Sequence, residues 1–415
     1  AIATLTGHMP NAEWTLMVYL AGDNSLSPNA FVDIDELRRA GSTEAVNVVV
    51  MHDSLYEAPT RYRVEQGGAG ELPESLPELD TGDGQTLVEF VVWASERWPA
   101  RRYALILWSH GSGWDQAEMV KIAQAAAPPD FDISETAHRG ESTLRRTFFR
   151  STLRRIAELP TRSQRAVCVD DGSGHSLDTV ELGRAMAQIA ANLGRPLDLL
   201  GMDACLMANL EVVYEIRSSV LVLVASEAPE PDSGWPYEAV LALFNAAPPA
   251  EPIALAGGIV GVFGDAADLK RDKRVSTLVA LDLAQVNALA AETDALAETL
   301  LAGIPATRQT LWIAHSKTTR FWGDTLADLG QLCGRLMTKA DPPLKAAAAA
   351  LGQRLAPGGV ITAAFARGKG VTGVGGLSIY LPVPRKTLIS KFYAETAFAR
   401  ERRWAALLGA YVRET

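Results

Sequence analysis

Two residues with reactive side chains, His110 and Cys205, each lie just beyond a short apolar run. His110 follows RYALILWS at 102–109 and precedes Gly-Ser-Gly, and Cys205 comes shortly after LDLLGM at 197–202. A cysteine thiolate is a good nucleophile, and a nearby imidazole can take its proton and later protonate a leaving group. If the fold brings these side chains together, they could perform acyl transfer through a covalent intermediate.

The surroundings of both residues would favour such chemistry. Gly111 and Gly113 would allow backbone N–H groups to approach a substrate carbonyl closely. We expect a helix over 206–217, beginning directly after Cys205, so that its positive end lowers the pKa of the thiol. Each signal is weak alone, because a lone histidine, or a cysteine after a strand, is more often structural.

The other two cysteines, Cys168 and Cys333, have no such surroundings. The three cysteines are far apart and odd in number, and the chain contains no CxxC pair. This pattern argues against a disulfide framework and against a cysteine-based metal site. We expect Cys168 and Cys333 to be core thiols.

The elements that would position His110 and Cys205 alternate between strands and helices. Strands are predicted at 14–21, 46–52, 61–65, 102–109, 197–202 and 220–226, and helices at 29–40, 84–98, 179–192 and 206–217. This alternation predicts an α/β protein with a mainly parallel central sheet and helices on both faces. In such sheets catalytic groups gather beyond the carboxyl ends of the strands, which is where both residues lie.

The rest of the chain predicts additions to this core. Residues 238–350 are rich in Ala and Leu and predict helices, with a strand near 271–283, and two further strands are predicted at 359–367 and 375–382. We expect a tail or cloning remnant at 1–12, a catalytic core at 13–240 with a basic insert at 115–165, and helical and strand elements at 241–415. This last part would complete the sheet and form a C-terminal subdomain.

Composition argues against several classes of function. The net charge is −10 and the pI is about 5.2, which disfavours a nucleic-acid partner because phosphate binding relies on a basic surface. No apolar run approaches the roughly 20 residues that span a bilayer, so we expect no membrane segment. Residues 1–12 show no basic region followed by an apolar stretch. The compartment stays open between secreted or periplasmic and cytoplasmic.

Five blocks, in order along the chain, resemble the signature of clostripain-like cysteine peptidases. They are TLMVYLAGDNSL at 15–26, LILWSHGSGW at 105–114, MDACLMA at 202–208, ASEAPEPDSGWPY at 225–237 and GGLSIYLP at 375–382. The resemblance implies a caspase-like fold and an endopeptidase in which His110 is the general acid–base and Cys205 the nucleophile that forms a thioester. Backbone N–H groups of Gly111 and Cys205 would hold the oxyanion, and no metal would take part in the chemistry.

The same resemblance implies cleavage after Arg or Lys, which requires carboxylates in the substrate pocket. Asp203 lies where the family places one such acid, two residues before Cys205. For the second acid we favour Asp232, with Glu230 and Glu227 as the other candidates. Structural roles stay open for two of them: Asp203 would cap the following helix, and Asp232 would be a solvated turn residue.

Asp23 and Asn24 follow the first predicted strand at the same edge of the sheet. They would line the rim of the site or, as we favour, form an Asx turn that shapes it. Some relatives in the family depend on calcium, although this sequence contains no EF-hand pattern. We expect no cofactor for catalysis and keep a structural calcium ion as the one metal to consider.

The basic insert is the segment whose charge differs most clearly from that of the acidic chain. Relatives are often cut between the histidine and cysteine strands, giving two chains that stay together. We expect self-cleavage after an arginine between Arg139 and Arg165, the candidates being Arg145, Arg146, Arg150, Arg154 and Arg155. The helical spacing of apolar residues at 141–159 argues against cleavage in the folded state, because a protease needs an extended substrate segment. A solvated basic helix face is the plainer alternative.

The expected partners are protein or peptide substrates with basic residues, and the expected form is a monomer, of two chains after processing. A non-catalytic caspase-like scaffold that binds a partner is the alternative function, and retention of both His110 and Cys205 counts against it. A serine hydrolase is a weaker alternative, because no G-x-S-x-G elbow occurs in a strand–turn–helix context.

Overall fold

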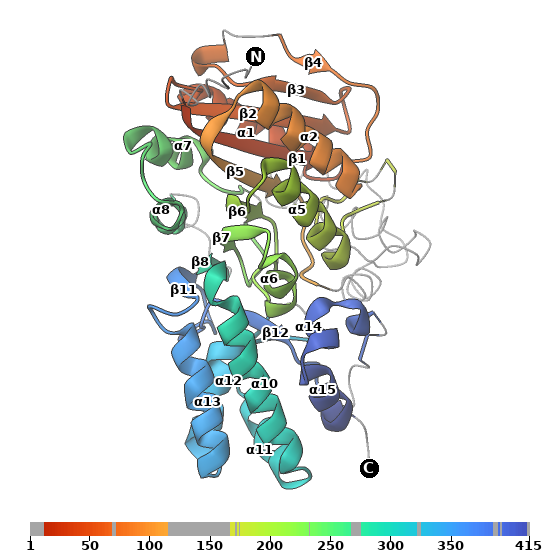
Figure 1. The fold of residues 1–415 in the computed structure, drawn as a ribbon, viewed down its shortest axis with the longest axis vertical. Helices are drawn as coiled ribbons and strands as arrows, with labels where there is room; N and C mark the ends of the chain where they lie inside the picture. Colours follow the sequence, from red (N-terminus) through yellow and green to blue (C-terminus); the bar gives the residue numbers. More distant parts are fainter. Residues whose placement is uncertain are drawn as a thin grey trace, which may run out of the picture.

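A central sheet organises the molecule (Figure 1). The computed structural model describes residues 12–68, 72–114, 167–170, 172–173, 175–231, 233–266, 275–321, 325–384, 389–390 and 392–412. Within these residues the sheet has nine strands in the order β11-β8-β7-β6-β5-β1-β2-β3-β4. The strands are β1 Ala12–Gly22, β2 Val46–Ser54, β3 Thr60–Arg63, β4 Glu74–Ser75, β5 Ala100–Trp108, β6 Leu197–Asp203, β7 Val220–Ala225, β8 Ser276–Asp282 and β11 Ile361–Arg367.

The middle of this sheet is parallel. β1 pairs in parallel with β2 and β5, β5 with β6, and β6 with β7, whereas the strands at both edges join antiparallel. Every residue of β2 and of β6 is buried, as expected for apolar strands covered on both faces. The predicted α/β class with a mainly parallel sheet is confirmed.

Side chains of β1 alternate between two hydrophobic cores, one on each face of the sheet. Met17 and Tyr19 join the core covered by α2, α5 and α6, whereas Leu16 and Val18 join the core covered by α1, α7 and α8. These helices are α1 Ser27–Ala40, α2 Gly84–Arg97, α5 Thr179–Leu193, α6 Leu210–Ile216, α7 Tyr237–Ala246 and α8 Pro252–Asp265. Helices therefore cover both faces, as the alternation of elements predicted.

The C-terminal part adds a helical group and a second sheet beyond the end of the central sheet formed by β8 and β11 (Figure 1). The helices are α10 Val286–Ala302, α11 Ala306–Ser316, α12 Leu329–Lys339, α13 Pro342–Leu355, α14 Ala397–Glu401 and α15 Trp404–Val412. The second sheet has the order β12-β10-β9, with β9 Arg320–Phe321, β10 Leu326–Asp328 and β12 Ser378–Tyr380. The strand predicted at 375–382 therefore lies in this small sheet. None of the described helices is long and apolar enough to cross a membrane.

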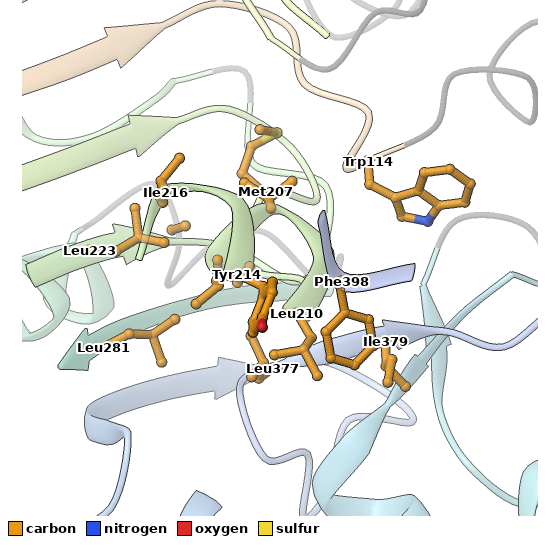
Figure 2. Packing of buried hydrophobic residues seen from close by; sticks show 14 of the residues in the cluster. Trp114, Met207, Leu210, Tyr214, Ile216, Leu223, Leu281, Leu377, Ile379 and Phe398 are labelled. Carbon is orange, nitrogen blue, oxygen red and sulfur yellow. The ribbon is translucent and has the colours of Figure 1, made fainter. Parts of the chain in front are cut away.

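Helix α6 joins the central sheet to the C-terminal part. Figure 2 shows Leu210 and Tyr214 of α6 beside Leu377, Ile379 and Phe398, which come from the β12 segment and α14. All five side chains are buried in one hydrophobic core. Because α6 follows the loop that contains Cys205, this packing holds one side of that loop in place.

Glu211 of α6 is an acidic residue inside this junction. It is 0% exposed, and its Oε1 accepts hydrogen bonds from the Tyr380 N–H over 3.1 Å and from the Tyr393 hydroxyl over 3.2 Å. Its second oxygen, Oε2, is buried without a hydrogen-bond partner. Burial raises the pKa of Glu211 to about 7, so the protonated form is favoured in the folded protein.

The raised pKa of Glu211 predicts a loss of stability with rising pH. Below the ordinary pKa of 4.5 the side chain is protonated in both states. As the pH rises from there through about 7, stability is lost, because the unfolded chain gives up this proton while the folded protein keeps it. Glu211→Gln stays uncharged, so we expect its free energy of unfolding to gain about 3 kcal/mol relative to wild type between about pH 5 and pH 8. Urea unfolding across this range measures the difference.

The matched control is Glu89→Gln, which removes an exposed carboxyl from α2. Its stability should follow the wild-type pH dependence. Parallel curves for wild type and Glu211→Gln would show that Glu211 does not titrate as the structure implies.

Candidate active site

The loops after β5 and β6 meet at the carboxyl edge of the sheet. The two strands pair in parallel with Trp108 opposite Asp203, and the Ser109 N–H donates to the Asp203 carbonyl over 3.3 Å. His110 and Cys205 each lie two residues beyond these paired strand ends. The register of the two strands therefore places both residues at the edge where α/β proteins carry their sites.

Gly111 is a point of contact between the two loops. A Cβ atom on Gly111 would lie 2.4 Å from the carbonyl oxygen and 2.9 Å from the amide nitrogen of Cys205. These separations are well below van der Waals contact, so a residue without a side chain is needed there. The structure thus brings the backbones of Gly111 and Cys205 together, and His110 is the residue directly before this contact.

His110 is buried and uncharged near neutral pH. It is 4% exposed, and burial lowers the pKa of its imidazole to about 4. Its Nε2 lies 3.0 Å from Oγ of Ser25, in the turn after β1, the strand next to β5. A neutral imidazole can accept a proton, as a general base must. Sequence reasoning missed Ser25, although its position at a neighbouring strand end was a usable signal.

Cys205 differs from the other two cysteines in its exposure. All three are free thiols, and Cys205 is partly exposed whereas Cys168 and Cys333 are buried. Burial raises the pKa of both buried thiols, which keeps them protonated and unreactive; their prediction as core thiols agrees with this. The Glu230 N–H donates to Sγ of Cys205 over 3.2 Å, and such a donor stabilises negative charge on sulfur.

The prediction that a helix begins directly after Cys205 is wrong. Helix α6 begins at Leu210, and Asn209 caps it by accepting the Val212 N–H over 3.1 Å. Cys205 lies in a turn in which Leu206 has φ of 68°. Such a left-handed residue interrupts a helix, and apolar periodicity does not reveal it. The thiol is therefore not at a helix end, and the alternative role kept open for Asp203, capping that helix, belongs to Asn209 instead.

Asp203 and Glu230 form a buried pair of carboxyl groups beside Cys205. Oδ2 of Asp203 accepts from the Trp235 N–H over 3.1 Å and from the Tyr237 hydroxyl over 2.9 Å. The Glu230 carboxyl lies close to that of Asp203, and its Oε2 accepts from the Trp235 indole over 3.0 Å. Burial, and for Glu230 also the charge of Asp203, raises the pKa of both acids. Two adjacent carboxyls out of water share a proton more readily than they carry two charges.

A third acid, Asp33 of α1, lies close enough to interact with this pair. Its Oδ2 accepts from the Trp108 indole over 2.7 Å, and it is 3% exposed. Burial first, and then the charge of Asp203, raises the pKa of Asp33 to about 9. The surroundings of Asp203 and Glu230 therefore combine acidic groups with two buried tryptophans, Trp108 and Trp235. Sequence reasoning did not identify Asp33, because it lies in α1, far from Asp203 along the chain.

The structure distinguishes between the candidates for the second acid of the pocket. Glu230 lies against Asp203, whereas Glu227 is buried beside Asp328 of β10. Asp232, the acid favoured from the sequence, lies outside the described residues. The self-cleavage candidates also lie outside them, namely Arg145, Arg146, Arg150, Arg154 and Arg155. Among the described candidates, Glu230 is therefore the one next to Asp203.

The favoured interpretation of Asn24 is confirmed. Its Oδ1 accepts the Leu26 N–H over 2.9 Å, which is an Asx turn, and its Nδ2 donates to the carbonyls of Ala21 and Val169 over 2.8 and 2.7 Å. Asp23 accepts the Gly172 N–H over 3.0 Å. Across the described ranges, Asp23 belongs to the one group of three acidic side chains that could hold a metal ion.

Comparison with known sequences gives a family match over most of the chain. The profile of the clostripain family matches residues 18–130 and 156–410. Clostripain from Hathewaya histolytica is 23% identical over 262 residues, a match that covers 55% of this chain and 42% of that protein. The chain therefore spans less than half the length of this curated relative.

Two solved structures share the fold. A secreted C11 cysteine protease from Bacteroides thetaiotaomicron, in complex with an irreversible peptide inhibitor, aligns over 95% of this chain and 100% of its own, with a TM-score of 0.63 and 17% identity. An inactive zymogen C11 protease from Parabacteroides distasonis aligns over 95% and 99%, with a TM-score of 0.63 and 18% identity. At these identities the likeness concerns the fold, and the predicted caspase-like class is confirmed.

Proposed function

We propose that this chain, which belongs to the clostripain family of cysteine peptidases, cleaves peptide bonds with Cys205 as the nucleophile and His110 as the general acid–base. The observation that carries this proposal is the contact of the loops after β5 and β6, where Gly111 packs against the backbone of Cys205. The partial exposure of Cys205 and the N–H donor to its Sγ support the same assignment.

In the proposed reaction His110 acts first as a general base and then as a general acid. The neutral imidazole of His110 takes the thiol proton, and the thiolate attacks the substrate carbonyl carbon. Backbone N–H groups of Gly111 and Cys205 hold the resulting oxyanion. The imidazolium then protonates the leaving amine as the C–N bond breaks, which leaves a thioester on Cys205. Water attacks this thioester, and its proton passes through His110 back to sulfur as the acid product leaves.

Substrate specificity in this proposal comes from Asp203 and Glu230. The two carboxyls share a buried site, and Oε1 of Glu230 is buried without a hydrogen-bond partner. A guanidinium or ammonium group would replace the shared proton and pair with both oxygens, which removes the cost of an unsatisfied buried acceptor. We therefore propose cleavage of protein or peptide substrates after Arg or Lys, with Glu230 in the role first given to Asp232.

The first prediction concerns the nucleophile. Cys205→Ala should lower hydrolysis of a fluorogenic peptide ending in arginine by at least about a thousandfold, and a thiol alkylator should abolish the activity of wild type. Cys333→Ala is the matched control, because Cys333 is a buried thiol in α12 away from this chemistry, and its kcat should stay within a factor of about two. Unchanged hydrolysis by Cys205→Ala would favour a non-catalytic scaffold or another nucleophile.

The second prediction concerns the second acid. Glu230→Gln keeps the backbone N–H that contacts Sγ but removes the ionisable group, so we expect kcat/KM for the arginine peptide to fall by about 10- to 100-fold while Cys205 alkylates at the wild-type rate. Glu227→Gln is the matched control, since Glu227 pairs with Asp328 instead. Equal losses in the two variants, or an equal loss on a peptide without a basic residue, would contradict the assignment.

Self-processing in the basic insert is part of the same proposal. The family match is interrupted at residues 131–155, which include Arg145, Arg146, Arg150, Arg154 and Arg155. Arginine is also the residue that the Asp203–Glu230 pair would recognise. A segment that interrupts the family pattern and contains several arginines in its sequence is a suitable substrate for the chain's own site.

The third prediction tests self-processing. Purified wild type should convert from one band to two on denaturing gels, and mass spectrometry should place the new terminus after an arginine between Arg139 and Arg165. Cys205→Ala should remain one chain, and Cys333→Ala should be cut like wild type. If wild type stays intact wherever Cys205→Ala does, the chain does not process itself.

A further inference from the structure

Apolar side chains lie in two neighbouring loops at the carboxyl edge of the sheet. Leu55 and Tyr56 belong to the loop after β2 and are 42% and 63% exposed. Leu26, in the turn after β1, is partly exposed. Among the exposed large hydrophobic residues of the described ranges, Leu55 and Tyr56 are the one pair adjacent along the chain. Single exposed apolar residues are ordinary, whereas grouped ones often mark a surface that binds a partner.

Hydrogen bonds fix the loop after β2 and join it to the start of α1. The Leu55 N–H donates over 3.2 Å to Oγ of Ser27, the residue directly after Leu26. Oγ of Ser54 accepts the Tyr56 N–H over 3.3 Å and the N–H of the following residue over 3.1 Å. We call Leu26, Leu55 and Tyr56 the rim strip. Because its loops are already held in place, a ligand that covers it loses little affinity to ordering them.

The order of the strands places the rim strip on the side of the leaving group. Along the carboxyl edge the strands run β7-β6-β5-β1-β2. Cys205 follows β6 and His110 follows β5, so the leaving amine that His110 protonates in the proposed function departs on the β5 side of the thiol. Beyond β5 the next loops are those after β1 and β2, which contain the rim strip.

A direct contact joins His110 to the first of these loops. Nε2 of His110 lies 3.0 Å from Oγ of Ser25, the residue directly before Leu26. Neighbouring strands are about 4.8 Å apart, and an extended peptide advances about 3.4 Å per residue. The loop after β1 is therefore one strand spacing from β5, within reach of the first or second residue after the scissile bond. The loop after β2, about 10 Å from β5, is within reach of the third.

We propose that the rim strip binds the part of a substrate that follows the scissile bond, and selects peptides with apolar or aromatic side chains at the second to fourth residues after it. Leu26 would contact the nearer of these residues, and Leu55 with Tyr56 the farther ones. Binding removes apolar surface of both partners from water. This inference rests on the proposed function and extends it: the acidic pocket recognises a cation before the bond, and the rim strip an apolar segment after it.

Two internally quenched peptides test the proposal. Each contains one arginine, and the second to fourth residues after the bond that follows it are apolar in one peptide and serine in the other. Wild type should cleave the apolar peptide with a kcat/KM about tenfold higher. Leu55→Ser combined with Tyr56→Ser should lower this ratio below about two, by slowing cleavage of the apolar peptide. Equal rates with wild type, or an unchanged ratio in the double variant, would overturn the proposal.

Leu221→Ser is the matched control. Leu221 has the same exposure as Leu55, 42%, but it lies at the amino end of β7, on the opposite edge of the sheet. Its ratio should remain about tenfold. All the substituted side chains are exposed, so both variants should melt within about 2 °C of wild type. Equal losses on the two peptides in the double variant would mean that the loop after β2 has a structural role only, contrary to the proposal.

Binding without hydrolysis separates this proposal from the proposed function. Dye-labelled forms of both peptides are titrated with Cys205→Ala, which keeps the rim strip, and the apolar peptide should bind about tenfold more tightly. Adding Leu55→Ser and Tyr56→Ser should remove the difference. If wild type hydrolyses neither peptide and the difference in affinity persists, the binding surface is supported while the peptidase assignment fails.

The absence of a preference in both hydrolysis and binding would show that the rim strip does not select substrates. Sedimentation measures whether a second copy of the chain covers the strip instead. We expect wild type and the double variant to have the same oligomeric state. A dimer of wild type that the double variant does not form would assign the rim strip to self-association and contradict the proposal.

Discussion

The parallel pairing of β5 with β6 is the constraint on which the candidate site depends. Trp108 lies opposite Asp203, so the two strands end together and their loops must pass each other at the carboxyl edge. Gly111 makes that passage sterically possible, since any side chain there would overlap the Cys205 backbone. A shift of the register by one residue would reverse the faces on which both strand ends place their side chains. The geometry of the site therefore depends on the pairing of β5 with β6.

Buried carboxyl groups are the second common feature of this edge. Asp203 with Glu230, Asp23 with Asp53 and Asp170, and Glu227 with Asp328 each put acids together away from water. Such groups cost stability when they ionise without partners. The fold can carry them because burial raises the pKa of Asp203, Glu230, Asp53 and Glu227, which favours the uncharged forms of these acids. The overall acidity of the chain would not by itself locate any of these sites.

The C-terminal part holds the loop that contains Cys205 in position through its contacts with α6. Helix α6 packs between the central sheet and the segment around β12 and α14 (Figure 2), and Glu211 joins the two through Tyr380 and Tyr393. The loop with Cys205 is therefore fixed at one end by β6 and at the other by a helix held on both sides. This explains how a turn containing a left-handed residue can keep one conformation.

The sequence alone determined the strands of the parallel core, because apolar runs such as 102–109 and 197–202 indicate buried segments, whereas the short strands β4, β9 and β10 were not predicted. From these followed the parallel sheet, the two strand ends with His110 and Cys205, and the family. Tertiary structure decided the partners: Ser25 beside His110, Glu230 beside Asp203, and the meeting of Asp53 with Asp170. It also decided that α6 starts at Leu210. The physical reason is that periodicity records how each residue is buried, whereas the contacts depend on a strand order in which β1 lies between β2 and β5 and neighbours in space are distant along the chain.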